Sequence, residues 1–164
     1  MTRQAVLFDL DGVLLDSGPA VRTALAAVAT CATGHRTTPA DLPPCALRRP
    51  RAEVLTLLGA QARWWDGALA AALPALFPGV LTGLLTLRAD DVAIGVVTLQ
   101  DRNRLKWWFP PALAELLDVV ITPQDAPGKP APDGPNAALA QLGVEPEHAV
   151  LVGDSPSDPP FCTT

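Results

Sequence analysis

The sequence predicts an α/β fold, in which a parallel β-sheet carries helices on both faces and a smaller helical unit is inserted after the first strand. Short apolar segments with the pattern of buried strands recur along the chain, and each ends in a polar residue. Helical patterns separate the later strands, and alternation of this kind favours a parallel sheet covered on both faces.

The strands and helices of this core are expected at regular places. Buried strands are predicted over 5–9, 91–98, 118–122 and 149–154. Helices are predicted over 79–89, 101–109 and 133–143. Because ligands bind at the carboxyl edge of such a sheet, the polar residues that end the strands are the candidates for function.

Residues 16–78 do not follow this alternation and contain no strand-like segment. Helical patterns cover 20–32, 51–62 and 64–77. A helical segment after the first strand is most simply a second domain. We therefore expect an α/β core formed by 1–15 and 79–164, with a helical cap formed by 16–78.

The composition excludes several classes of protein. Apolar residues make up 49% of the chain, which argues against disorder, and the net charge of −5 without a basic stripe argues against nucleic acid as a partner. No apolar segment approaches the roughly 20 residues of a membrane span. Three cysteines without CxxC spacing fit reduced thiols. We expect a soluble, cytoplasmic protein without a membrane partner.

Two carboxylates follow the first strand in the segment FDLDG. Asp9 and Asp11 are separated by one residue, and Gly12 allows a sharp turn after them. Carboxylates this close repel one another unless a cation or a shared proton relieves the repulsion. A hard divalent cation such as Mg²⁺ suits the pair, and a turn with two solvated aspartates is the alternative.

Three further segments place polar side chains after strands or in a loop. Asp154 and Asp158 lie in GDSPSD, which taken alone could be an ordinary Asp-Ser-Pro turn. Thr98 ends the second strand and offers a hydroxyl and backbone N–H groups. Lys129 precedes a helix and would supply the positive charge that an anionic substrate needs beside carboxylates. A threonine or lysine in such a place is more often structural or solvated.

Taken together and in order, these segments resemble the four motifs of the haloacid dehalogenase-like hydrolase superfamily, in the subgroup with a small helical cap. The resemblance extends over roughly residues 4–158 and rests on DLDGVLLDS, VVTLQ, GKPAPD and VGDSPSD. The second motif is looser, because Leu99 stands where many relatives have Asn. The resemblance implies a Rossmann-like core.

The resemblance also implies a Mg²⁺-dependent phosphatase that acts on a small phosphorylated metabolite. Asp9 would be the nucleophile that forms an aspartyl-phosphate, and Asp11 would be the general acid and then the base. Thr98 and Lys129 would bind the phosphoryl oxygens. The implied metal site consists of Asp9, the Asp11 backbone carbonyl, Asp154 and, through metal-bound water, Asp158.

An aspartate at position 11 is typical of the phosphatases and phosphomutases of the superfamily, and the dehalogenases generally lack it. A sugar phosphomutase of the same subgroup therefore stays an alternative. Substrate choice is expected to depend on the cap. Arg49 and Arg51, in LRRPRAE, could meet an anionic leaving group or could form a solvated basic turn.

Relatives continue after the fourth motif with a helix, a strand and another helix, whereas here Asp158 is followed by two prolines and four further residues. We therefore expect a truncated C-terminus and a fourth strand at an exposed sheet edge, through which copies could self-associate. Catalytic carboxylates lose effect when displaced. A catalytically impaired phosphate-binding or interaction protein is thus the functional alternative.

Overall fold

The computed structural model describes residues 3–47 and 49–155, and it divides the chain into two compact units. One unit combines Met1–Leu15 with Leu76–Thr164, and the other consists of Asp16–Ala75. Each unit has its own buried apolar residues. Asp158 and the rest of the segment 156–164 lie outside the described residues.

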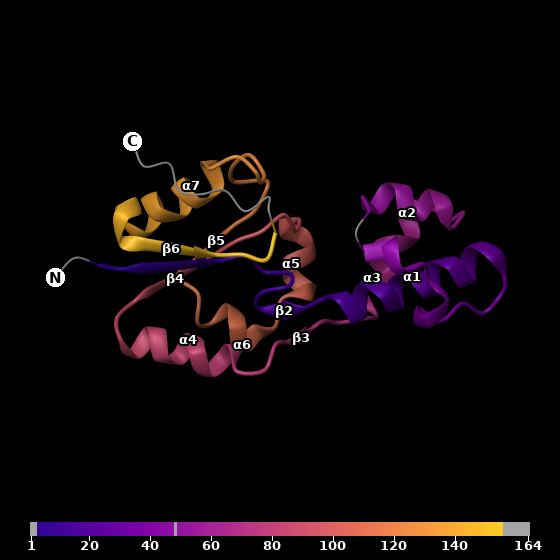
Figure 1. Cartoon of the computed structure of the whole chain (residues 1–164), viewed down its shortest axis with the longest axis horizontal. Helices are drawn as coiled ribbons and strands as arrows, with labels where there is room; N and C mark the ends of the chain where they lie inside the picture. Colours follow the sequence, from indigo (N-terminus) through magenta and orange to yellow (C-terminus); the bar gives the residue numbers. More distant parts are fainter. Residues whose placement is uncertain (1–2, 48, 156–164) are drawn as a thin grey trace. The chain divides into compact units, whose positions relative to one another are not determined.

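The first unit is built on a parallel sheet (Figure 1). Its strands pair in the order β5 (Val119–Ile121), β4 (Ala93–Val97), β1 (Ala5–Phe8) and β6 (Ala149–Val152). Leu7 of β1 stands opposite Gly95 on one side and Leu151 on the other. The four strands are those expected from the sequence, shortened by one to three residues, and the predicted fold class is confirmed.

Helices cover both faces of this sheet (Figure 1). On one face, α7 (Asp133–Leu142) contacts β1, β4 and β5. On the other face, α4 (Val80–Ala89) contacts β4, and the short helix α6 (Pro111–Ala114) lies beside it. The helix α5 (Arg102–Trp108) follows β4 directly. The 3₁₀ turn Pro146–His148 leads into β6.

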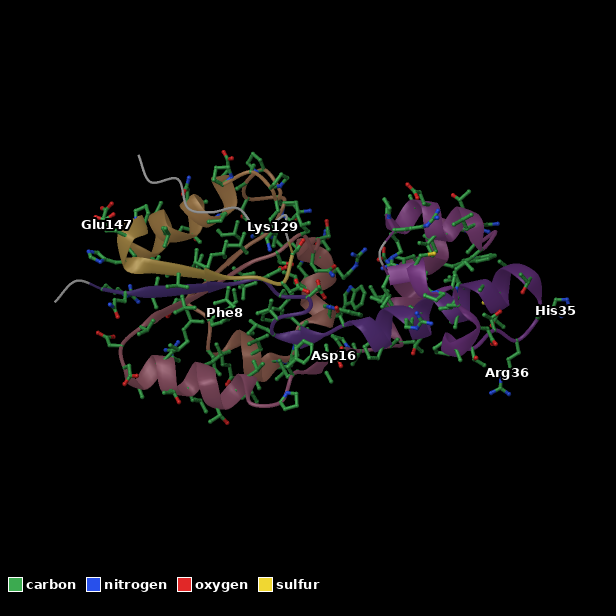
Figure 2. The ribbon with its side chains drawn as sticks, viewed as in Figure 1. Phe8, Asp16, His35, Arg36, Lys129 and Glu147 are labelled. Carbon is green, nitrogen blue, oxygen red and sulfur yellow. The ribbon has the colours of Figure 1, made fainter. Side chains whose placement is uncertain are left out.

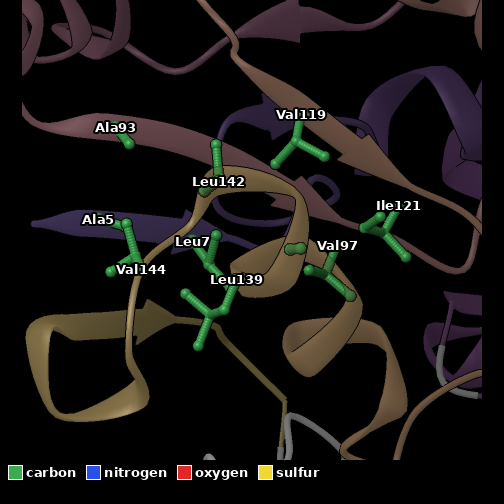
Figure 3. Packing of buried hydrophobic residues seen from close by; sticks show 10 residues of the cluster. Ala5, Leu7, Ala93, Val97, Val119, Ile121, Leu139, Leu142 and Val144 are labelled. Carbon is green, nitrogen blue, oxygen red and sulfur yellow. The ribbon is translucent and has the colours of Figure 1, made fainter. Parts of the chain in front are cut away.

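The main apolar cluster fills the space between the sheet and α7 (Figure 3). Successive residues of a strand point to opposite faces, so alternate strand residues reach it. The members are Ala5, Leu7, Ala93, Val97, Val119, Ile121, Ala138, Leu139, Leu142 and Val144. Full burial of one such Leu or Val contributes about 1.5–3 kcal/mol, so this cluster holds β1, β4 and β5 together as a rigid base for the loops.

The second unit is helical. Its helices are α1 (Gly18–Thr33), α2 (Arg51–Leu57) and α3 (Trp65–Ala70), with 3₁₀ turns at Pro39–Asp41, Pro44–Leu47 and Ala62–Trp64. The helix α1 packs against α2 and α3, and it buries Leu25 and Val28. Among the described residues, no helix is long and apolar enough to cross a bilayer.

The prediction that residues 16–78 contain no strand is wrong at both ends of that range. The strands β2 (Leu15–Asp16) and β3 (Ala75–Leu76) pair with each other where the chain passes between the units. Strands of two residues are too short to show a period of two. The helix predicted over 64–77 ends at Ala70, and Pro74 further along disfavours helical backbone at the residue before it.

The strand β6 forms one edge of the sheet, as expected for the fourth strand. Within residues 3–47 and 49–155 it pairs with β1 alone, and its Val150 and Val152 side chains are 58% and 37% exposed. Unpaired backbone groups and exposed valines are the features on which self-association through this edge would depend.

The loop between β5 and α7 is shaped by Asp125, whose carboxylate accepts several hydrogen bonds. Its Oδ2 accepts hydrogen bonds from the Thr122 hydroxyl at 2.8 Å and from the Thr122 backbone N–H at 2.9 Å, and its Oδ1 pairs with Arg102. The hydrogen bond from the Thr122 hydroxyl is the main cause that lowers the pKa of Asp125 below its ordinary value.

We predict that Asp125→Ala lowers the free energy of unfolding by at most about 1 kcal/mol near neutral pH, because the bonds are partly exposed. Since folding lowers this pKa, the stabilisation is present above the ordinary Asp range and disappears as the pH falls through the lowered value. Urea unfolding of the wild type and of Asp125→Ala, from neutral pH down to acid pH, tests the prediction. A stability difference that is unchanged in acid would contradict it.

Candidate active site

Polar residues gather where the parallel strands end. Asp9 follows β1, Thr98 follows β4, and Asp154 comes two residues after β6. Lys129 lies at the same edge, on the loop before α7, whereas Glu147, which precedes β6, lies at the opposite end of the sheet (Figure 2). The carboxyl edge of a parallel sheet is where ligands bind in such folds.

Asp9 and Lys129 form a buried ion pair. Lys129 Nζ lies 2.9 Å from Asp9 Oδ1, and the two side chains are 3% and 15% exposed. The backbone N–H of Leu10 also donates to Asp9 Oδ1, at 2.7 Å. Burial of an ammonium is costly unless an anion compensates it. The pair therefore fixes both the position of the carboxylate and the loop that carries the lysine.

Asp11 is held by a residue from the next loop. Its Oδ2 accepts a hydrogen bond of 2.6 Å from Gln100 Nε2. Its Oδ1 is buried and has no hydrogen-bond partner among the residues that the structure describes. A buried carboxylate oxygen without a partner is uncommon in folded proteins. The two oxygens of Asp11 thus have different surroundings.

Asp154 packs against the loop that carries the other two aspartates. Gly12 has a φ of 85°, and a Cβ at this position would lie 2.2 Å from Asp154 Oδ2. Glycine is therefore required here for two reasons, the left-handed backbone and the close approach of a carboxylate. The contact brings Asp154 beside the Asp9–Asp11 loop.

Thr98 and Lys129 line one small cavity of about 10 Å³, which is roughly the size of one water molecule. The backbone N–H of Thr98 donates to the Ile121 carbonyl at 3.0 Å, so this N–H is already used in the fold. The Thr98 Oγ1 accepts a bond of 3.0 Å from the Gln100 N–H. The hydroxyl proton of Thr98 can therefore donate to a further oxygen.

The chemistry of these residues fits a hard cation such as Mg²⁺. Carboxylates of Asp9 and Asp154 and the Asp11 carbonyl are oxygen donors of the kind that Mg²⁺ prefers, and Asp154 lies against Gly12, directly after Asp11. In residues 3–47 and 49–155, no cluster of three His, Cys, Asp or Glu side chains has the arrangement of a metal site. Of the three aspartate side chains that the resemblance implies for the metal site, two, those of Asp9 and Asp154, lie within these residues. The third, Asp158, lies outside the described residues.

The predicted specificity residues lie in the helical unit. Arg49 is half-exposed and forms a long ion pair of 4.0 Å with Glu53. The Arg51 guanidinium lies 4.4 Å from the centre of the Trp65 ring, and Trp65 is buried. This geometry is that of a cation–π contact. Arg51 therefore has a packing role within its own unit, and contact of either arginine with a leaving group stays a prediction.

The sequence did not indicate the roles of Gln100 and Arg104. Gln100 contacts Asp11 and Thr98, and its Oε1 accepts a bond of 2.9 Å from Arg104 Nη1. An amide side chain is neither charged nor nucleophilic, so it carries no chemical signal of its own. The loose match of the second motif around Leu99 was the only sign that this loop differs from that of relatives.

Comparison with known proteins identifies the family. The family model described as haloacid dehalogenase-like hydrolase matches residues 4–162. The chain therefore belongs to the haloacid dehalogenase-like hydrolases, as its motifs indicated.

Relatives of this chain carry the names of phosphatases. A phosphoglycolate phosphatase from Rhodospirillum rubrum is 30% identical, over 94% of this chain and 73% of that protein. One from Nitrosococcus oceani is 35% identical, over 51% of this chain and 38% of that protein, so this chain spans little more than a third of it.

Solved structures share the fold. A Thermotoga maritima protein assigned as a beta-phosphoglucomutase has a TM-score of 0.78 at 26% identity, with 94% of this chain and 77% of that chain covered. A protein from Lactobacillus plantarum, assigned as a phosphoglycolate phosphatase, has a TM-score of 0.72 at 29% identity, with 96% and 80% covered.

We predict that Gly12→Ala weakens Mg²⁺ binding about 10–100-fold, because the added methyl group displaces the Asp154 carboxylate. Isothermal titration calorimetry with Mg²⁺ alone measures the effect. Gly143→Ala is the matched control, since Gly143 also has a positive φ, 66°, and a Cβ there would have no atom within 4 Å. Equal Mg²⁺ affinities of the two variants would contradict the prediction.

Proposed function

We propose that this protein is a Mg²⁺-dependent phosphatase that hydrolyses a small phosphorylated metabolite through an aspartyl-phosphate. The observation that carries the proposal is the buried pair of Asp9 and Lys129, with Asp11 two residues further along the same loop. This arrangement supplies a nucleophile, a cation for the phosphoryl group and a second carboxylate for proton transfer. The phosphatase names of its relatives support the same class of reaction.

Asp9 is the nucleophile in this proposal. Lys129 and the Leu10 N–H both contact Oδ1 of its carboxylate and fix the direction of the side chain. An oxygen of Asp9 attacks phosphorus, a bond from this oxygen to phosphorus forms, and the bond from phosphorus to the leaving oxygen breaks. The leaving group departs, and the phosphoryl group stays on Asp9.

Asp11 transfers the proton in both halves of the reaction. In the first half it donates a proton to the leaving oxygen. In the second half it takes a proton from a water molecule, whose oxygen then attacks the phosphorus of the aspartyl-phosphate. Inorganic phosphate is released, and Asp9 and Asp11 return to their starting states.

Positive charge and hydrogen bonds stabilise the phosphoryl oxygens during transfer. Lys129 would bind them as a point charge, and the Thr98 hydroxyl would donate to one of them. Mg²⁺ held by Asp9, the Asp11 carbonyl and Asp154, with Asp158 orienting its waters, would supply the remaining positive charge. The carboxylates alone would repel the substrate.

A sugar phosphomutase is the second candidate, favoured by the likeness to the Thermotoga maritima protein. Such an enzyme would use the same aspartates but return the phosphoryl group to a sugar hydroxyl. The two activities differ in product, because a mutase isomerises a sugar phosphate with little release of inorganic phosphate.

We predict that Asp9→Asn lowers the hydrolysis of 4-nitrophenyl phosphate about a thousandfold or more, and that removal of Mg²⁺ abolishes it. Released phosphate is measured, with Asp133→Asn as a control on the exposed start of α7. Activity that survives Asp9→Asn or metal removal would refute this mechanism. A folded wild-type protein without activity would favour the catalytically impaired alternative.

We predict that Arg49→Ala raises the KM for the preferred phosphorylated metabolite by up to about fivefold, the loss expected of an exposed charge contact worth up to about 1 kcal/mol. Arg51→Ala should raise the KM and also lower the Tm, because it removes the contact with Trp65. Kinetics on a metabolite panel and thermal melts test this. A KM that neither change alters would remove both arginines from substrate recognition.

A further inference from the structure

We propose that Gln100 is a positioning residue for Asp11, and that Arg104 sets the orientation of Gln100. This inference rests on the proposed phosphatase function and deepens it. The three side chains form a continuous chain of contacts, with 2.6 Å from Gln100 Nε2 to Asp11 Oδ2 and 2.9 Å from Arg104 Nη1 to Gln100 Oε1. They come from the loop after β1, the loop after β4 and the helix α5.

Arg104 decides which end of the amide faces Asp11. A guanidinium can only donate hydrogen bonds, so the atom of Gln100 that it contacts must be the amide oxygen. The amide nitrogen then faces Asp11 and can only donate. Without this contact the Gln100 amide could turn and place its oxygen against the Asp11 carboxylate. The two oxygens would then repel each other.

A donor at Asp11 Oδ2 distinguishes the two oxygens of this carboxyl group. Because Gln100 donates to Oδ2, this oxygen acts as an acceptor. The other oxygen, Oδ1, is buried and has no hydrogen-bond partner among the described residues. Gln100 thus sets the direction of the Asp11 side chain.

Gln100 itself is anchored to the sheet. Its backbone N–H donates to Thr98 Oγ1 at 3.0 Å, and Thr98 ends the buried strand β4. Asp101 then caps α5 by accepting from the Asn103 N–H at 2.8 Å. Arg104 lies in the first turn of α5, and its guanidinium contacts the Gln100 side chain just before the helix. A rigid strand-to-helix junction therefore holds the amide against Asp11.

A positioning role and a merely structural role differ in their dependence on the leaving group. A phenolate leaves readily only if an acid protonates it, whereas a dinitrophenolate leaves as an anion and needs little help. Loss of correct placement of Asp11 should therefore slow cleavage of phenyl phosphate far more than that of 2,4-dinitrophenyl phosphate. General disturbance of the site would slow both equally.

The test compares wild type with Gln100→Met, which keeps the length of the side chain and removes the donor. Single-turnover release of the phenol, with enzyme in excess and Mg²⁺ present, isolates the first step. We expect the rate on phenyl phosphate to fall about 10–100-fold, the rate on 2,4-dinitrophenyl phosphate to stay within about threefold, and KM to change little. Gln141→Met, on the exposed side of α7, is the matched control.

Arg104→Met provides a second variant that leaves Gln100 in place. It should show the same selective loss on phenyl phosphate, because the amide is no longer held in one orientation. Equal losses of rate on both substrates, or no loss of rate in either variant, would overturn the positioning role. The phosphatase proposal would still stand in that case, provided that the wild type is active. A wild type inactive on both esters would overturn the phosphatase proposal itself.

Discussion

The buried ion pair between Lys129 and Asp9 is the constraint on which the rest of this site depends. Lys129 is 3% exposed, and an ammonium so far from water is tolerated only beside an anion. Asp9 is itself fixed, because it follows β1 and its backbone N–H donates to the Val152 carbonyl of β6 at 2.8 Å. The loop after β5 is therefore bound to the ends of two other strands.

The remaining contacts of the site also join one loop to another. Gln100 reaches from the loop after β4 to Asp11, and Asp154 reaches from the loop after β6 to Gly12. Each strand of the sheet thus contributes to a single connected set at its carboxyl edge. Since packed strands hold these loops, a substitution in one loop is expected to act on carboxylates that another loop carries.

The proposed site would balance charge in the way that phosphoryl transfer requires. In the proposed mechanism, carboxylates would supply the nucleophile, the proton and the ligands for a cation, while Lys129 and the metal would offset the negative charge of the phosphoryl group. The apolar cluster under α7 contributes no chemistry, but it keeps β1, β4 and β5 in register so that the short loops can be placed with the accuracy that catalysis needs.

Sequence alone determined the alternation of strands and helices, the helical insertion and the motif residues Asp9, Asp11, Thr98, Lys129 and Asp154, because apolar periodicity and charged residues at strand ends are local signals. The two-residue strands β2 and β3 and the early end of α3 gave no such signal. Tertiary structure decided the contact of Gly12 with Asp154, the use of the Thr98 N–H by Ile121, and the chain from Arg104 through Gln100 to Asp11. These pairings join segments far apart in the chain or depend on side-chain direction, and only the folded sheet brings them within hydrogen-bonding distance.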